Sequence, residues 1–251
     1  MNSITFSFIK SKFTSYYINN DIIFPKELSK REFGFANLSM KPSIYRHISF
    51  KNKEEIKSYL LQRPPLDAFY GCAYYNVPNA PVMKEKEWLG ADLIFDLDGD
   101  YLSQTMKYNE MLYNIKCETQ KLLYELLDTF AIDRKNIELV FSGNRGYHIH
   151  VYDKSFIEWK QYERRELVNY LITKCDIDPP VSYDIVRLIR IPNSLHGKTG
   201  MVAEMIPLDK FDKWEPHIMA SSNTIKTTIG YLTEWDAIFR ILKQKNIEIL
   251  Q

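Results

Sequence analysis

Two carboxylates follow a strongly apolar segment near the middle of the chain. Leu93-Ile94-Phe95 has the character of a buried strand, and Asp96 and Asp98 come directly after it. Because successive side chains of a strand alternate between its faces, Asp96 and Asp98 should point the same way. Two like charges are costly to remove from water, so this pair must stay near solvent, bind a proton or be neutralised by a metal ion.

The length, hydrophobic content and net charge of the chain indicate its general class. A chain of 251 residues, 45% of them hydrophobic, can bury a full core and is most simply one large domain or two tightly joined lobes. The net charge of +1 lacks the basic character of a protein that coats nucleic acid by itself, so nucleic acid would be gripped locally or with the help of a partner.

Cysteine usage and the N-terminus bear on the compartment. Cys72, Cys117 and Cys175 are widely spaced without a CxxC pair, which argues against a disulfide framework and a cysteine zinc site. Residues 1–20 match neither a secretory signal nor a membrane span. We therefore expect a soluble, unprocessed, cytoplasmic protein with no membrane partner.

Helical and strand patterns alternate along the chain. The spacing of apolar residues predicts a helix from Ser3, others over residues 53–63 and 161–175, a long one capped by Ser103 and reaching Phe130, and a last one over residues 233–245. Strands are expected at 137–141, 147–151, 181–191 and 201–206, the first two paired as a hairpin.

The hairpin connection is itself a candidate site. Two glycines in Ser142-Gly143-Asn144-Arg145-Gly146 permit a tight loop with exposed N–H groups, and Arg145 suits phosphate oxygens, so the loop could hold a triphosphate. His148 and His150 should share the face opposite the apolar one. The alternative is an ordinary glycine-containing hairpin with a surface arginine.

A later segment mixes one acid with several cations. Asp184 would be a third metal ligand, and Arg190, His196 and Lys198 would face phosphate charge if the bends at Pro192 and Gly197 let them converge. The alternative is a solvated basic turn after a strand. Arg46, near a strand edge, is by itself typical of ordinary surface.

Five segments occur in a fixed order between about residues 10 and 206: Arg31-Glu32-Phe33-Gly34-Phe35, Tyr45-Arg46-His47-Ile48-Ser49-Phe50, the run from Trp88 to Asp98, Ser142-Gly143-Asn144-Arg145-Gly146-Tyr147-His148, and the run from Arg187 to Gly200. Together they resemble the successive motifs of the catalytic small subunit of archaeal and eukaryotic DNA primases. The resemblance implies an α+β fold, with mixed β-sheets flanked by helices and the active site between two lobes of a single catalytic domain over residues 1–251.

The resemblance also implies a reaction, namely two-metal synthesis of short primers de novo on single-stranded DNA. Asp96, Asp98 and Asp184 would bind Mg²⁺ or Mn²⁺, which prefer oxygen ligands. The positions that match the nucleoside triphosphate contacts of the family are Arg46, Ser142, Arg145, His148, Arg190 and His196, with Lys198 close by. A large primase subunit would be the partner, supplying DNA affinity that a near-neutral chain lacks. The roles of Arg31, Glu32 and Arg187 stay open.

One departure from the family pattern concerns zinc. The family usually carries a zinc-binding knob between the Asp-x-Asp strand and the Ser-Gly loop. Residues 99–141 of this chain contain Cys117 as their single cysteine and no histidine. A tetrahedral zinc site cannot be built from that segment, so no structural zinc is expected.

Other functions fit parts of the pattern. Residues 93–100 also resemble the first motif of haloacid-dehalogenase-like phosphatases, in which a strand-end aspartate is the nucleophile. His148, His150 and His196 could form a tri-histidine metal site. Within the primase superfamily, a repair or end-joining polymerase and a non-catalytic subunit are the nearest alternatives. Activity on an unprimed template separates primase from end-joining polymerase.

Overall fold

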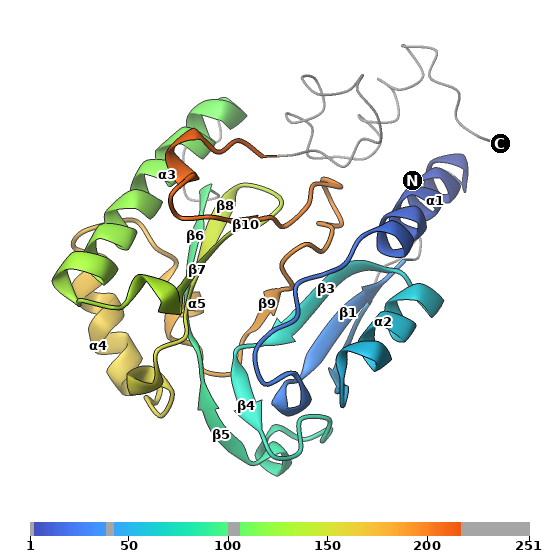
Figure 1. The fold of residues 1–251 in the computed structure, drawn as a ribbon, viewed down its shortest axis with the longest axis horizontal. Coiled ribbons are helices and arrows are strands. Elements are labelled where there is room, and N and C mark those ends of the chain that lie inside the picture. Colours follow the sequence, from blue (N-terminus) through green and yellow to red (C-terminus); the bar gives the residue numbers. More distant parts are fainter. Residues whose placement is uncertain (1–2, 39–42, 100–105, 217–251) are drawn as a thin grey trace.

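Two four-stranded antiparallel sheets form the centre of the computed structural model, which describes residues 3–38, 43–99 and 106–216 (Figure 1). The first sheet has the order β2-β1-β3-β9 and the second β10-β7-β8-β6. Every pair of neighbouring strands within these described ranges is antiparallel, including the small ribbon of β4 and β5. Helices pack on the outer side of each sheet, which confirms the α+β class.

The elements have the following bounds. The helices are α1 (Ser3–Asn19), α2 (Lys53–Gln62), α3 (Tyr108–Tyr124), α4 (Gln161–Leu171) and α5 (Pro179–Tyr183), and a π-helical turn, Glu125–Thr129, continues α3. The strands are β1 (Phe33–Asn37), β2 (Ile44–Ile48), β3 (Pro65–Gly71), β4 (Ala73–Tyr75), β5 (Trp88–Ala91), β6 (Leu93–Asp98), β7 (Ile137–Phe141), β8 (Gly146–Val151), β9 (Leu188–Arg190) and β10 (Met205–Ile206).

Each sheet has a core of its own. Leu93, Phe95 and Leu97 of β6 pack with β7, β8, α3 and α4 in one hydrophobic cluster. Phe33 and Phe35 of β1 pack with α1, α2 and β3 in the other. The face of β6 opposite Leu93, Phe95 and Leu97 carries Ile94, which packs in the cluster of the first sheet, and Tyr70 Oη of β3 lies 2.9 Å from His150 Nδ1 of β8. The face of β6 that carries Asp96 and Asp98 is therefore directed toward the first sheet.

A buried ion pair ties the two halves together beside β4. Arg31 and Asp92 are both almost completely buried and form a salt bridge, and the Arg31 guanidinium also donates to the Cys72 carbonyl at 2.6 Å. Arg164 of α4 donates to the Asp92 carbonyl at 2.8 Å. Arg31, whose role the sequence leaves open, thus has a structural role.

Several predicted elements are confirmed. Helices begin at Ser3 and Lys53, the second capped by Asn52, whose side chain accepts the Glu55 N–H at 2.9 Å. The hairpin of β7 and β8 forms as expected. The helix predicted over 161–175 ends at Leu171, and the long helix begins, in the described part, at Tyr108. The predicted cap at Ser103 and the helix over 233–245 lie outside the described residues.

The strand predicted over residues 181–191 forms only as β9, Leu188–Arg190, and the prediction is wrong for the residues before it. Asp178 caps α5 by accepting the Val181 N–H at 3.3 Å, and Pro179 and Pro180 occupy the first turn, where proline favours a helix. Asp184 then closes a turn by accepting the Val186 N–H at 2.9 Å, so pairing begins only at Leu188. The strand predicted over 201–206 is likewise reduced to Met205–Ile206.

The described helices include none with the length and apolar character that a bilayer crossing requires.

Candidate active site

Asp96 and Asp98 lie half-buried on the inward face of β6. In the register with β8, Asp96 is opposite His148 and Asp98 is opposite Gly146. The Asp96 carboxylate oxygen Oδ1 is 3.6 Å from His148 Nε2. The apolar alternation of β6 thus places both acids on one face, as the sequence predicts.

Helix α5 brings Asp184 toward the same strand. The Asp178 N–H donates to the Asp96 carbonyl at 2.8 Å, and the Asp96 N–H donates to Ser182 Oγ at 3.5 Å. Asp184 follows two residues after Ser182. Among the described residues, however, no three histidine, cysteine, aspartate or glutamate side chains lie close enough to form a ready metal site. This holds for Asp96, Asp98 and Asp184 and equally for the tri-histidine alternative.

Cationic and potentially cationic groups converge next to Asp96. Burial, and then the charges of nearby His150, Arg190, Arg187 and His196, hold the pKa of His148 well below its ordinary value. Burial, followed by Arg190, lowers the pKa of His196 to about 3. Both histidines are therefore neutral near pH 7, and a ligand there meets neutral imidazoles beside charged guanidinium groups.

Arg190 of β9 is held by Asp67 of the neighbouring strand β3. Arg190 Nη1 lies 2.6 Å from Asp67 Oδ1 and also donates to the Leu195 carbonyl at 3.0 Å. The same carboxylate oxygen accepts the Gly197 N–H at 2.7 Å. Asp67 therefore fixes both Arg190 and the loop that carries His196 and exposed Lys198, although no sequence motif singled it out.

The Ser142–Gly146 loop packs against this second loop. Thr199 Oγ1 donates to the Gly143 carbonyl at 2.5 Å, and Ser142 Oγ accepts the Gly146 N–H at 3.2 Å. Gly143 has a φ of 83°, and a Cβ there would approach the His196 Cβ to 2.8 Å, so both backbone and space require glycine. Arg145 of this loop lies near Tyr108, whose pKa burial raises while Arg145 opposes the rise.

Arg46 forms a bidentate ion pair with Glu32. Its Nε and Nη2 atoms lie 3.0 and 3.3 Å from the two oxygens of Glu32, whose side chain is completely buried. The fully buried Lys86 ammonium is 3.6 Å from the same carboxylate, and the His47 N–H donates to it at 3.1 Å. Burial alone would raise the pKa of Glu32, but Arg46 and these neighbours outweigh it and hold that pKa below its ordinary value.

Glu32 was noted in the sequence without a role, and Lys86 was missed. A buried carboxylate between an arginine and a lysine restricts the arginine to one orientation. The Arg46 side chain reaches across the first sheet, because a Cβ at Gly34 would be 3.7 Å from its Cγ and only 2.6 Å from Leu188 Cδ1. Gly34 therefore leaves room for the Arg46 side chain and for Leu188 of β9.

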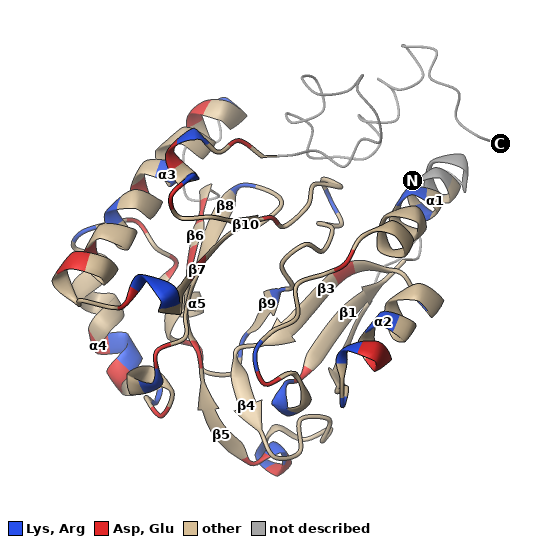
Figure 2. Ribbon diagram, in the orientation of Figure 1, with Lys and Arg blue, Asp and Glu red and all other residues tan. Residues whose placement is uncertain are grey.

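Charge elsewhere is distributed differently. Figure 2 shows residues of both signs along the outer helices α3 and α4, whereas the first sheet is largely uncharged. Of the predicted site residues, the structure brings His148, Arg190 and His196 close to Asp96 of β6, while Arg46 is on β2 and Asp184 follows α5.

Comparison with known proteins identifies the family. Residues 95–175 match the family model for the DNA primase small subunit. The chain is 32% identical over 279 residues to the small subunit PriS of Archaeoglobus fulgidus, covering 83% of each chain, and 34% identical to that of Thermoplasma volcanium, covering 80% of it. With PriS of Methanoregula boonei the identity is 45% over 188 residues, or 72% of this chain and 49% of that one.

The chain spans about half the length of the Methanoregula protein and of PriS from Methanocella arvoryzae and Methanospirillum hungatei. Among solved structures, it resembles the polymerase domain of Mycobacterium tuberculosis Ligase D in complex with DNA, with a TM-score of 0.56, 13% identity, and coverage of 94% of this chain and 88% of that one. At that identity the likeness concerns the fold alone. The extended identity to PriS sequences, together with the ordered motifs, shows that this chain belongs to the DNA primase small subunit family.

Proposed function

We propose that this chain is the catalytic subunit of a DNA primase that joins nucleotides into short primers de novo on single-stranded DNA. The observation that carries the proposal is the meeting of the β6 carboxylates with Arg190, His148 and His196 between the two sheets. Phosphoryl transfer needs this combination, since acids bind the cations that accompany a triphosphate and cations face its spread charge. We propose that both sheets belong to one catalytic domain.

Asp96, Asp98 and Asp184 would hold the divalent cations, Mg²⁺ or Mn²⁺. Their fit rests on donor chemistry, since two half-buried carboxylates share one face of β6 and α5 packs on that strand at Asp96. When bound, such ions supply activation of the attacking 3′-hydroxyl and neutralisation of the leaving pyrophosphate. No structural zinc is part of the proposal.

The triphosphate would be bound by the groups opposite these acids, namely Arg46, Ser142, Arg145, His148, Arg190, His196 and Lys198. Arg190 is presented in a fixed orientation by Asp67, and Arg46 by Glu32. Pre-oriented cations stabilise transition-state charge without reorganising during the reaction. Glu32 and Asp67 are therefore positioning residues for Arg46 and Arg190.

The single-stranded DNA template and a large primase subunit complete the proposal as partners. A net charge of +1 gives the chain little general attraction for DNA, so the partner would contribute much of the affinity.

Primer synthesis is tested by incubating the chain, alone and with a large subunit, with unprimed single-stranded DNA, nucleoside triphosphates and Mg²⁺ or Mn²⁺. Radiolabelled products are resolved on a denaturing gel. The double substitution Asp96→Ala with Asp98→Ala should reduce incorporation by roughly a thousandfold or more, because the cations lose their ligands. Unaltered incorporation would exclude the metal assignment. Extension of primed but never of unprimed DNA would favour an end-joining polymerase instead.

Membership of the primase family argues against the phosphatase alternative. Metal-dependent hydrolysis of phosphomonoesters without template would nevertheless revive it.

A further inference from the structure

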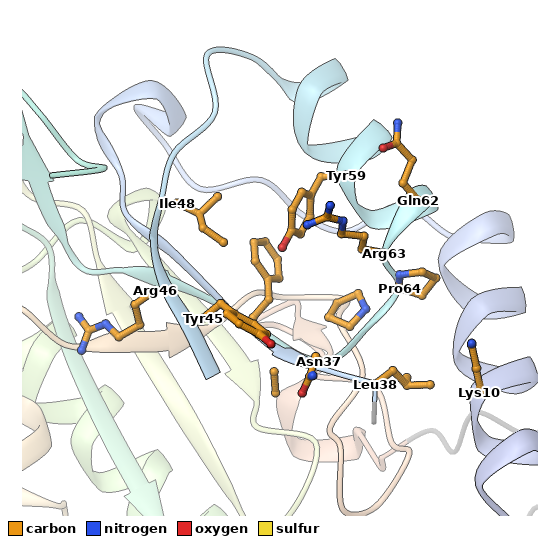
Figure 3. Close-up of a pocket in the computed structure, with 13 residues that line it drawn as sticks. Lys10, Asn37, Leu38, Tyr45, Arg46, Ile48, Tyr59, Gln62, Arg63 and Pro64 are labelled. Carbon is orange, nitrogen blue, oxygen red and sulfur yellow. The ribbon is translucent and has the colours of Figure 1, made fainter. Parts of the chain in front are cut away.

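A pocket of about 670 Å³ lies between α1, α2, β1 and β2, on the other side of the first sheet from the candidate active site (Figure 3). Its volume is within the range of about 300–1,000 Å³ that is usual for sites of small molecules. None of the proposed catalytic acids lines it, and Arg46 is the one proposed triphosphate contact among its described lining residues.

Aromatic rings form two of its walls. The Tyr59 ring packs 4.8 Å from Phe35 and 5.4 Å from Phe50, centroid to centroid, so it is fixed from behind. Tyr45 is opposite Phe35 in the register of β1 and β2, yet its side chain is 52% exposed. A large ring held over a pocket with half its surface in water is ready to stack on a planar ligand.

The charge of the pocket has one sign. Lys10 of α1, Arg63 after α2 and Arg46 all line it, and the described residues of its wall include no acid. The Arg63 side chain forms a hydrogen bond with Tyr59. Burial raises the pKa of Tyr59, and the charge of Arg63 opposes that rise. Figure 3 shows Lys10 and Arg63 on separate elements at the rim. The pocket thus fits an anion that also has an aromatic part.

We propose that this pocket binds one nucleotide unit of the single-stranded DNA template, with the base against Tyr45 and Tyr59 and its phosphates near Arg63 and Lys10. This inference rests on the proposed function. Stacking on aromatic rings combined with dispersed cations is the usual means of holding single strands without regard to sequence.

A strand suits the pocket better than a free triphosphate. Figure 3 shows Lys10 and Arg63 apart from each other at the rim, whereas a triphosphate requires cations concentrated around one group. The Arg46 guanidinium is engaged by Glu32 and, as Figure 3 shows, points away from Tyr59 and Arg63. The adjacent β2 residues Tyr45 and Arg46 therefore serve different sites. Tyr45 faces the pocket proposed for the DNA template, and Arg46 belongs to the proposed triphosphate site.

The test measures binding of an unprimed, fluorescein-labelled oligo(dT) to the full chain at low salt by anisotropy. Tyr45→Ala should weaken binding at least about fivefold, the lower end of what the loss of one base–aromatic stack costs. Arg63→Gln should weaken binding and flatten its salt dependence. Matched controls are Tyr162→Ala and Arg134→Gln, exposed residues on the side of the second sheet, which should bind as the parent chain does.

Photo-crosslinking with 5-iodo-deoxyuridine in the oligonucleotide should give a modified peptide that contains Tyr45 or Tyr59. If Tyr45→Ala bound DNA as the parent chain does and the crosslinks fell elsewhere, template binding in this pocket would be excluded. Primer synthesis by the parent chain would in that case still support the proposed function. If Tyr45→Ala raised the KM for nucleoside triphosphate but left DNA binding unchanged, the occupant of the pocket would be a free nucleotide. That result would also overturn the proposal that the template binds there. Failure of the parent chain to bind or copy DNA, even with a large subunit, would remove both proposals.

Discussion

The inward faces of the two sheets use carboxylates in opposite ways. On the second sheet, Asp96 and Asp98 are half-buried and remain accessible for an ion that comes with the substrate. On the first, Glu32 is completely buried and the Asp67 side chain is 20% exposed, and each is paired with an arginine. The same functional group is thus a proposed ion ligand on the second sheet and the fixed counter-charge of an arginine on the first.

Glu32→Gln is the strongest test of this difference outside the acids of β6. It leaves the buried Lys86 ammonium without a charged partner and frees Arg46, so we expect a loss of about 3 kcal/mol in the free energy of unfolding. Chemical denaturation measures this. Adding Lys86→Met should restore much of the stability but not the orientation of Arg46, so nucleotide affinity would stay weak in the double variant. Equal stability of Glu32→Gln and parent would contradict the role assigned to Glu32.

The two sheets also differ in how tightly a glycine is packed in each. A Cβ at Gly146 would collide with the Leu97 carbonyl, a backbone atom of β6 next to Asp98, whereas a Cβ at Gly34 meets the end of the Leu188 side chain. Gly146→Ala should therefore cost about 2–3 kcal/mol and displace the carboxylates, and Gly34→Ala about 1 kcal/mol, because a side chain can rotate. Thermal unfolding of both variants checks the order. A larger loss at Gly34 would show that the first sheet is the less adaptable one.

Asp67→Asn should act on substrate binding more than on stability. The amide still offers an oxygen to the Gly197 N–H but loses the charge that holds Arg190. We expect KM for nucleoside triphosphate to rise roughly three- to tenfold with a smaller change in kcat. Asp133→Asn, which alters an exposed pair with Lys135, is the matched control and should leave both constants unchanged.

The smallest expected effect is on the pH dependence of stability. The pKa of Glu32 is below its ordinary value in the folded chain, so its contribution is fully present above about pH 4.5 and is lost as the pH falls through the folded pKa. Melting temperatures measured from pH 7 to pH 3 should fall more steeply for the parent chain than for Glu32→Gln. Parallel curves would mean that Glu32 is not ionised in the fold.

The sequence predicted those parts of the site that depend on local pattern. Alternation within residues 93–98 and 147–151 predicted the strands and the shared face of Asp96 and Asp98, and the short loop at 142–146 predicted the pairing of residues 137–141 with 147–151. Helix α5 was missed because the apolar residues after Pro180 were given more weight than Asp178, although an aspartate followed by two prolines is a helix-start signal. Asp67 and Lys86 could not be found this way, since their partners lie far away in sequence and only tertiary packing joins them.

The hydrogen bond between Tyr70 and His150 has a consequence for how the enzyme would work. Burial, followed by the charge of Arg31, lowers the pKa of His150 to about 3, so the imidazole is neutral, and the Tyr70 hydroxyl is also buried. Swinging the sheets apart would leave both groups unpaired, at roughly 1–3 kcal/mol each. A hinge is therefore a costly way to exchange nucleotide and product. The loops around Ser142 and His196, rather than the sheets, should set the rate at which the site fills and empties.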